Sequence, residues 1–88
     1  MLCTIYHGDF PDPDFGERVV VALAVFNDAI IRTARDRGLD VVDLRAVCAL
    51  TEDYTNPIEP SPTGGAKIAC AIAAIITGQS SGARLVGA

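Results

Sequence analysis

Hydrophobic residues in the first half of the chain are concentrated in two short segments and in one long helical pattern between them. Leu2–Tyr6 is a β-branched and aromatic run that predicts a buried strand, and a polar turn follows it. Over Glu17–Arg37 apolar residues recur at helical spacing, and charged residues occupy most of the other positions. Leu39–Leu44, in which Asp40 and Asp43 flank two valines, predicts a second strand. The order strand, helix, strand predicts parallel strands joined by a right-handed crossover.

The ends of the first predicted helix carry recognisable signals. Asp14, with Glu17 three residues later, has the spacing of a capping box at the start. Arginines in the last turn suit the negative end of a helix, and Gly38 is suited to the residue that follows it. The face that we expect to be buried consists of Val19, Leu23, Phe26, Ile30 and Ala34.

The second half of the chain contains a loop and another helix. Thr51–Pro60 has no regular pattern and holds two prolines, which predicts an irregular loop. Ser61 and Pro62 are suited to the N-cap and first position of a helix that continues through Ile76. Residues 79–88 are small and polar, and we expect them to fray. The fold class that follows is α/β, with a parallel sheet, one β-α-β unit and a C-terminal helix.

Composition suggests that this sheet is part of a larger structure. Of the 88 residues, 50% are hydrophobic and 20% are charged, which excludes a disordered tail. A chain this short buries only about 60% of its unfolded surface, so many of its apolar side chains need cover from elsewhere. We therefore expect a partner, either the N-terminal half of the same domain or a second copy of this chain.

Charge and run length exclude two classes of partner. The net charge is −4 and the seven basic residues are scattered, so the chain lacks the positive patch that nucleic acid requires. The longest apolar runs, 19–26 and 68–76, are well short of the roughly 18 residues that cross a membrane. We expect no nucleic-acid partner and no membrane span.

The cysteines predict neither a disulfide framework nor a metal site. Cys3, Cys48 and Cys70 are odd in number and widely spaced, and the chain has one histidine. Unpaired cysteines and the absence of a signal peptide favour a cytoplasmic location. We expect no cofactor and no metal.

Two weaker motifs favour structural interpretations. Asp9, Asp12 and Asp14 are interrupted by prolines, which is typical of turns rather than of a calcium loop. The segment 64–67 places two glycines and a lysine at a helix start, but it lacks the full phosphate-loop pattern. We expect its glycines to permit close packing of the helix on the sheet.

Polar side chains that could carry chemistry follow the two predicted strands. Ligands bind at the carboxyl ends of the strands in open α/β sheets. The loops that leave those ends are His7–Gly16 and Arg45–Pro60. Their candidate reactive residues are His7, Asp9, Asp12, Asp53, Tyr54, Asn56 and Glu59.

The segment Asp53–Ser61, running into Pro62–Ala69, resembles the last sequence block of the SGNH (GDSL-type) esterases and lipases. In that block an aspartate and a histidine three residues apart precede Pro-Ser or Pro-Asn and a glycine-bearing helix start. The helix around Phe26–Ile30 and the strand Val41–Leu44 are similar to the segment that leads into it. The resemblance covers Leu2–Thr77 and implies the C-terminal half of a three-layer, flavodoxin-like SGNH hydrolase domain.

The resemblance also implies which residues stand at the family's catalytic positions. The family's histidine falls on Glu59 and its aspartate on Asn56, while its nucleophilic serine and oxyanion residues have no counterpart here. Residues 1–78 are then the C-terminal part of a hydrolase of small esters that is catalytically incomplete as given. Glu59 is the candidate base, and the alternative is that Glu59 is only a solvated loop residue. Asn56 is a candidate substrate contact.

Two further hypotheses come from the residues themselves. His7 is the only histidine and follows a strand, so it is a second candidate for the base. The alternative to an enzyme is a non-catalytic, truncated module that self-associates or binds another chain. A phosphate-binding domain is a third hypothesis, and it rests on segment 64–67 alone.

Overall fold

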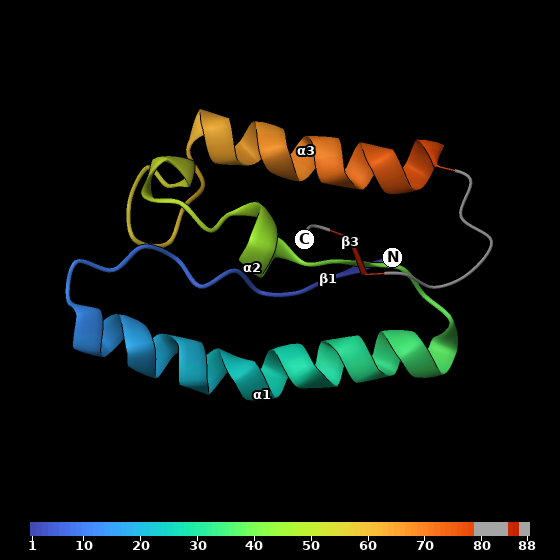
Figure 1. The fold of residues 1–88 in the computed structure, drawn as a ribbon, viewed down its shortest axis with the longest axis horizontal. Helices are drawn as coiled ribbons and strands as arrows, with labels where there is room; N and C mark the ends of the chain where they lie inside the picture. The colour runs from blue at the N-terminus through green and yellow to red at the C-terminus, as the bar shows by residue number, and fades with distance from the viewer. Residues whose placement is uncertain (79–84, 87–88) are drawn as a thin grey trace.

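The first two strands, the long helix between them and the later helix follow the order that the hydrophobic pattern predicts, and a short helix, a 3-10 turn and a third strand are additional (Figure 1). The computed structural model describes residues 1–78 and 85–86. The elements are β1 (Leu2–Cys3), α1 (Pro13–Arg37), β2 (Val41–Val42), α2 (Leu44–Val47), the 3-10 turn η1 (Thr51–Asp53), α3 (Pro62–Thr77) and β3 (Leu85–Val86).

The strands form a parallel sheet in the order β1-β2-β3. Leu2 pairs with Val41, so β1, α1 and β2 form the predicted β-α-β unit. The hydrogen bond from Thr4 N–H to the Val42 carbonyl (3.0 Å) continues the pairing one residue beyond β1. Of the tail 79–88, the structure describes only β3, which pairs in parallel with β2, and the rest of the predicted frayed segment lies outside the described residues.

Helix α1 and helix α3 lie on opposite sides of the strand layer (Figure 1). The centre of the small core is β2, whose Val42 has no exposed surface. The predicted inner face of α1 is confirmed at Ala34, which is buried, and in part at Val19, Leu23 and Ile30.

The prediction for Phe26 is wrong, because its side chain is 61% exposed and Asn27 is buried in its place. Asn27 continues the four-residue spacing of Val19 and Leu23 along the helix, whereas Phe26 lies about 100° away around the axis. Hydrophobicity favoured Phe26, but the backbone of Ile5 provides Asn27 with hydrogen-bond partners on that face.

Helix α1 begins four residues before the predicted start. Asp12 is the N-cap and accepts a hydrogen bond from the backbone of Asp14, so the predicted Asp14–Glu17 capping box is wrong. Pro13 occupies the first turn, where its missing N–H has no partner to lose. The helix ends as predicted at Gly38, which has a φ of 67° and donates to the Ala34 and Arg35 carbonyls.

The start of α3 matches the prediction. The Ser61 hydroxyl accepts from Gly64 N–H at 3.1 Å, and Pro62 is the first helical residue. Gly64 packs so closely on the 3-10 turn that a Cβ would overlap the Asp53 carbonyl oxygen, whereas a Cβ at Gly65 would meet open space. Close packing therefore depends on Gly64 and is made with η1 rather than with the sheet.

No helix within residues 1–78 is both long and apolar enough to cross a membrane.

Candidate functional site

The two loops that leave the carboxyl ends of β1 and β2 contact each other. The Tyr6 hydroxyl donates to the Ile58 carbonyl at 2.7 Å, and the Asp9 N–H donates to the Pro57 carbonyl at 3.0 Å. Gly8 lies between them with a φ of 79°, and a Cβ there would overlap the Pro57 oxygen. The two loops therefore lie together at one edge of the sheet.

Local hydrogen bonds hold the loop that contains Asn56 and Glu59. The Asn56 side-chain oxygen accepts from the backbone N–H groups of Ile58 (3.0 Å) and Glu59 (2.9 Å). The Thr55 N–H donates to the Glu59 carbonyl at 2.9 Å, which closes the turn. Asn56 therefore uses its acceptor to shape the loop, and the side chain of Glu59 remains exposed.

His7 is partly buried beyond the end of β1, in the electrostatic field of the Asp43–Arg45 pair. Burial lowers the pKa of its imidazole, the positive charge of Arg45 lowers it further, and the carboxylate of Asp43 opposes both effects. The neutral imidazole is therefore the dominant form at pH 7, and it can accept a proton. In the described part of the chain, no hydrogen bond joins His7 to Glu59.

The cluster that borders His7 was not among the predicted site residues. Arg45 makes a two-pronged ion pair with Asp43, with Nε 2.7 Å from Oδ1 and Nη2 3.0 Å from Oδ2. The Thr4 hydroxyl donates to the same Oδ1 at 2.9 Å and accepts from Leu44 N–H. Thr4 and Asp43 each directly follow a strand, which is the signal that could have identified them. Sequence alone does not show that these two positions, 39 residues apart, are adjacent.

Asp53 and Lys67 form a second ion pair, which fastens η1 to α3. Asp53 has no exposed surface, its Oδ1 lies 2.7 Å from Lys67 Nζ, and its Oδ2 accepts from Leu50 N–H at 3.0 Å. The hydrogen bond from Lys67 is the main reason that the pKa of Asp53 is lowered, with burial acting against it. Both residues serve this internal contact, which argues against Lys67 as a phosphate ligand.

Tyr54, the residue after Asp53, contacts both Cys48 and the β1 loop. Its hydroxyl donates to the Cys48 carbonyl at 2.6 Å, and its ring meets that of Tyr6 edge-on at 5.6 Å between centroids. Burial is the main cause that raises the pKa of Tyr54 to about 12. Tyr54 is therefore a protonated, structural donor at neutral pH.

Two predicted site residues remain, Asp9 and Asp12, and both make contacts within the fold. Asp12 caps α1, as turn chemistry predicts, and Asp9 faces Thr51, whose hydroxyl lies 3.5 Å from its carboxylate. Within the described residues, no three side chains of His, Cys, Asp or Glu are grouped so as to hold a metal ion.

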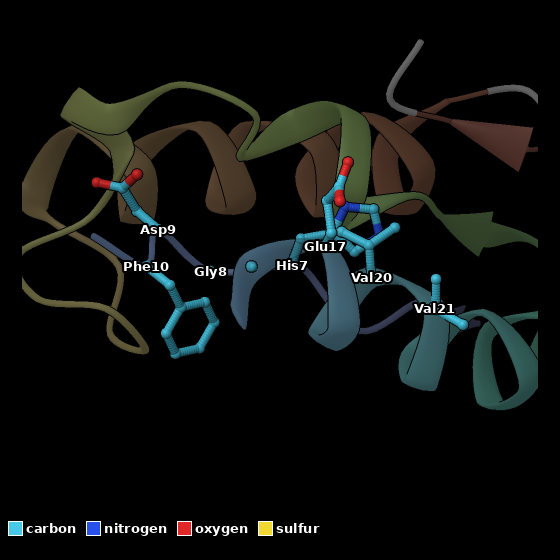
Figure 2. A pocket seen from close by; sticks show the side chains of 8 residues that line it. His7, Gly8, Asp9, Phe10, Glu17, Val20 and Val21 are labelled. Atoms are coloured by element: carbon cyan, nitrogen blue, oxygen red, sulfur yellow. The ribbon is translucent and has the colours of Figure 1, made fainter. Parts of the chain in front are cut away.

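Two open cavities adjoin this edge of the sheet and share His7, Gly8 and Phe10. One, of about 490 Å³, runs between the end of β1, the inner face of α1 and Ile58. The other, of about 630 Å³, lies between the β1 loop and the first turns of α1 (Figure 2). Both have the size of a small-molecule site.

Acid should destabilise the fold through the two paired carboxylates. The pKa values of Asp43 and Asp53 are lowered in the folded state, so each stabilises the protein above the unfolded pKa of about 3.9. That contribution is lost as the pH falls through the lower folded values. Urea unfolding between pH 7 and pH 2 is expected to show a steep loss of stability below about pH 4. Asp43→Asn and Asp53→Asn should each flatten this loss, and equal wild-type stability at pH 6 and pH 2.5 would contradict the assignment.

Comparison of the chain with protein-family models, with curated proteins and with solved structures finds no match.

Proposed function

We propose that the chain is the C-terminal α/β part of an SGNH-type, flavodoxin-like hydrolase that acts on ester bonds. The observation that carries the proposal is the contact of the two strand-end loops beside a neutral, partly buried histidine and two cavities. Hydrolysis of an ester by a serine needs a base within reach and donors for the oxyanion. The present residues supply the base, and the nucleophile and oxyanion donors are expected to come from sequence outside these 88 residues.

Of the two candidate bases, the geometry favours His7. The side chain of Glu59 is exposed and lines neither cavity, whereas His7 lines both and its neutral imidazole can accept a proton. Burial is the main cause that keeps His7 neutral, and the charge of Arg45 acts in the same direction while that of Asp43 opposes both. Glu59 and Asn56 line neither cavity and lie on the neighbouring loop, at the positions where the resemblance places the family's dyad.

The test compares the complete reading frame with the 88-residue chain. We expect hydrolysis of p-nitrophenyl esters by the product of the complete frame and none by this chain alone. In the active protein, His7→Gln should lower kcat by about 10²–10⁴-fold with little change in KM, because it removes a proton acceptor. Glu59→Gln is the matched comparison and should change kcat by less than about threefold. A reading frame with a stop directly upstream of Met1, or full activity of His7→Gln, would reject the proposed roles.

One observation favours the alternative of a non-catalytic, self-associating module. Large apolar side chains remain exposed close together on α1, and another is exposed near the end of α3. They are Val21 (71%), Val25 (72%), Phe26 (61%) and Ile76 (70%).

These side chains lead us to expect self-association of the isolated chain. Sedimentation velocity should show dimers or larger species at micromolar concentrations. Phe26→Ser should shift the population toward monomer by about tenfold in dissociation constant, because it removes exposed apolar area without touching the core. The charge-neutral control is Thr33→Ser, also exposed on α1. A monomer at all concentrations would count against both the module and any need for a covering partner.

A further inference from the structure

A regular stripe of exposed residues runs along one side of α1. The opposite side of this helix carries the buried residues Asn27 and Ala34 and faces the strands, so that α1 forms an outer layer of the molecule (Figure 1). On the open side, residues alternately four and three positions apart lie in one line, which is the spacing of the contact positions in packed pairs of helices. These residues form the outer stripe, and all of them are exposed: Asp14, Arg18, Val21, Val25, Asp28 and Arg32.

Apolar residues occupy the centre of the outer stripe. Val21 and Val25 are 71% and 72% exposed, so most of both side chains is in contact with solvent. Ala22 and Ala29 lie beside this centre and are small, which allows a second helix to approach to the usual distance of about 8–10 Å between axes. Phe26 lies one turn after Ala22, at the edge of the same surface. Burial of these apolar side chains against another apolar surface would be favourable.

Charged residues occupy the two ends of the outer stripe, and the order of their signs is the important feature. From the first residue to the last, the stripe has a negative charge, a positive charge, two valines, a negative charge and a positive charge. In the reverse direction the order is positive, negative, two valines, positive and negative. Two stripes that run in opposite directions therefore place each charge beside an opposite charge and each valine beside a valine.

We infer that two copies of this chain pair through their outer stripes, with the two α1 helices antiparallel and meeting level with Leu23. Val21 faces Val25 of the partner subunit, Arg18 faces Asp28 of the partner subunit, and Asp14 faces Arg32 of the partner subunit. The arrangement is two-fold symmetric, so each of these contacts occurs twice. The pairing goes beyond the proposed function and does not depend on ester hydrolysis.

The outer stripe specifies both the direction and the register of the pairing. In a parallel pair each residue would face its own copy, which would bring like charges together at every charged position of the stripe. In an antiparallel pair shifted by one heptad, the valines would face charged side chains. Of these arrangements, the unshifted antiparallel pair is the one that matches valine with valine and each charge with its opposite.

A shallow cavity on the first half of α1 fits this register. Its lining consists of Asp14, Glu17, Arg18, Val21 and Ala22. The first four have the spacing i, i+3, i+4 and i+7, which is that of the holes that receive one side chain from a facing helix. In the inferred pair, Asp28 of the partner subunit enters this hole beside Arg18. Within residues 1–78, neither Asp14 nor Arg18 forms an ion pair, so both charges remain to be paired between copies.

Charge reversal in the full 88-residue chain tests the inference. Arg18→Asp and Asp28→Arg each place like charges opposite each other at two symmetric points of the interface. Sedimentation velocity should therefore give each variant a dimer dissociation constant about tenfold higher than that of the wild type. Helical circular dichroism should be unchanged, because both positions are exposed.

A mixture of these two variants should recover the dimer. One variant carries aspartate at positions 18 and 28 and the other carries arginine at both, so the mixed pair again has opposite charges at all facing positions. Its dissociation constant should lie within about threefold of the wild-type value. Positions 18 and 28 are about 15 Å apart along one helix, so the recovery cannot come from a contact within one chain.

Two control variants separate the outer stripe from general surface effects. Arg37→Asp makes the same charge change at an exposed position of α1 outside the stripe, and Ile76→Ser removes an apolar side chain that is 70% exposed near the end of α3. Neither should change the dissociation constant by more than about twofold. Val25→Ser, at the centre of the stripe, should raise it by about tenfold.

A wild-type chain that is monomeric at all concentrations would overturn the inference, and so would a dimer that neither charge reversal weakens. A mixture as weak as the separate variants would place the interface elsewhere on the molecule and reject the outer stripe. If the single variants dimerised as tightly as the wild type and only the mixture bound more tightly, the helices would be parallel and the antiparallel arrangement would be wrong.

Discussion

Asn27→Ala is expected to lower the free energy of unfolding by about 2–4 kcal/mol, the larger of two effects expected from single substitutions. The Asn27 side chain has no exposed surface, and its oxygen accepts from Ile5 N–H at 2.7 Å while its nitrogen donates to the Ile5 carbonyl at 3.0 Å. Alanine removes both partners and leaves a partly buried donor and acceptor without replacements. Chemical denaturation monitored by circular dichroism measures the loss.

The neighbouring residue provides the control for this substitution. Asp28 is exposed and pairs with Arg32, four residues later and 3.3 Å away, so Asp28→Ala should cost less than about 0.5 kcal/mol. Asn27→Asp is the conservative comparison, because it keeps an acceptor but cannot donate to the Ile5 carbonyl at neutral pH. If Asn27→Ala were as stable as Asp28→Ala, the side chain would not be what fastens α1 to the end of β1.

Gly64→Ala is expected to destabilise the fold by about 1–3 kcal/mol, although alanine is the better helix former. The new methyl group would overlap the Asp53 carbonyl oxygen, which is backbone and cannot rotate away. That carbonyl also accepts from Ser61 N–H at 2.8 Å, so moving it would disturb the N-cap of α3. The helix start and η1 would therefore have to separate.

The next residue is a matched control with the same substitution on the same helix. A Cβ at Gly65 meets nothing within 4 Å, so Gly65→Ala should stabilise the protein by about 0.5–1 kcal/mol through helix propensity. Thermal unfolding of the two variants should thus shift in opposite directions. A shift in the same direction for both would show that propensity, and not contact with Asp53, governs this position.

The candidate site shows how far local patterns reach. Both strand-end loops were predicted from the two apolar runs, and Asn56, Glu59 and His7 do lie on them. The hydrophobic pattern did not predict that the Asn56 side-chain oxygen would accept hydrogen bonds from its own loop. Nor did it predict that Thr4 and Asp43 would border His7. Those outcomes depend on distances across the sheet, which spacing along the chain does not contain.

The sequence by itself determined the features that depend on a few neighbouring residues. Local propensity accounts for the left-handed glycine after α1, the Ser61-Pro62 start of α3 and the order β1, α1, β2, α3. The tertiary structure decided which side chains are buried: Asn27 instead of Phe26, and a buried Asp53 paired with Lys67. The reason is that a polar group can be buried only where a partner distant in sequence satisfies it, and only the fold supplies that partner.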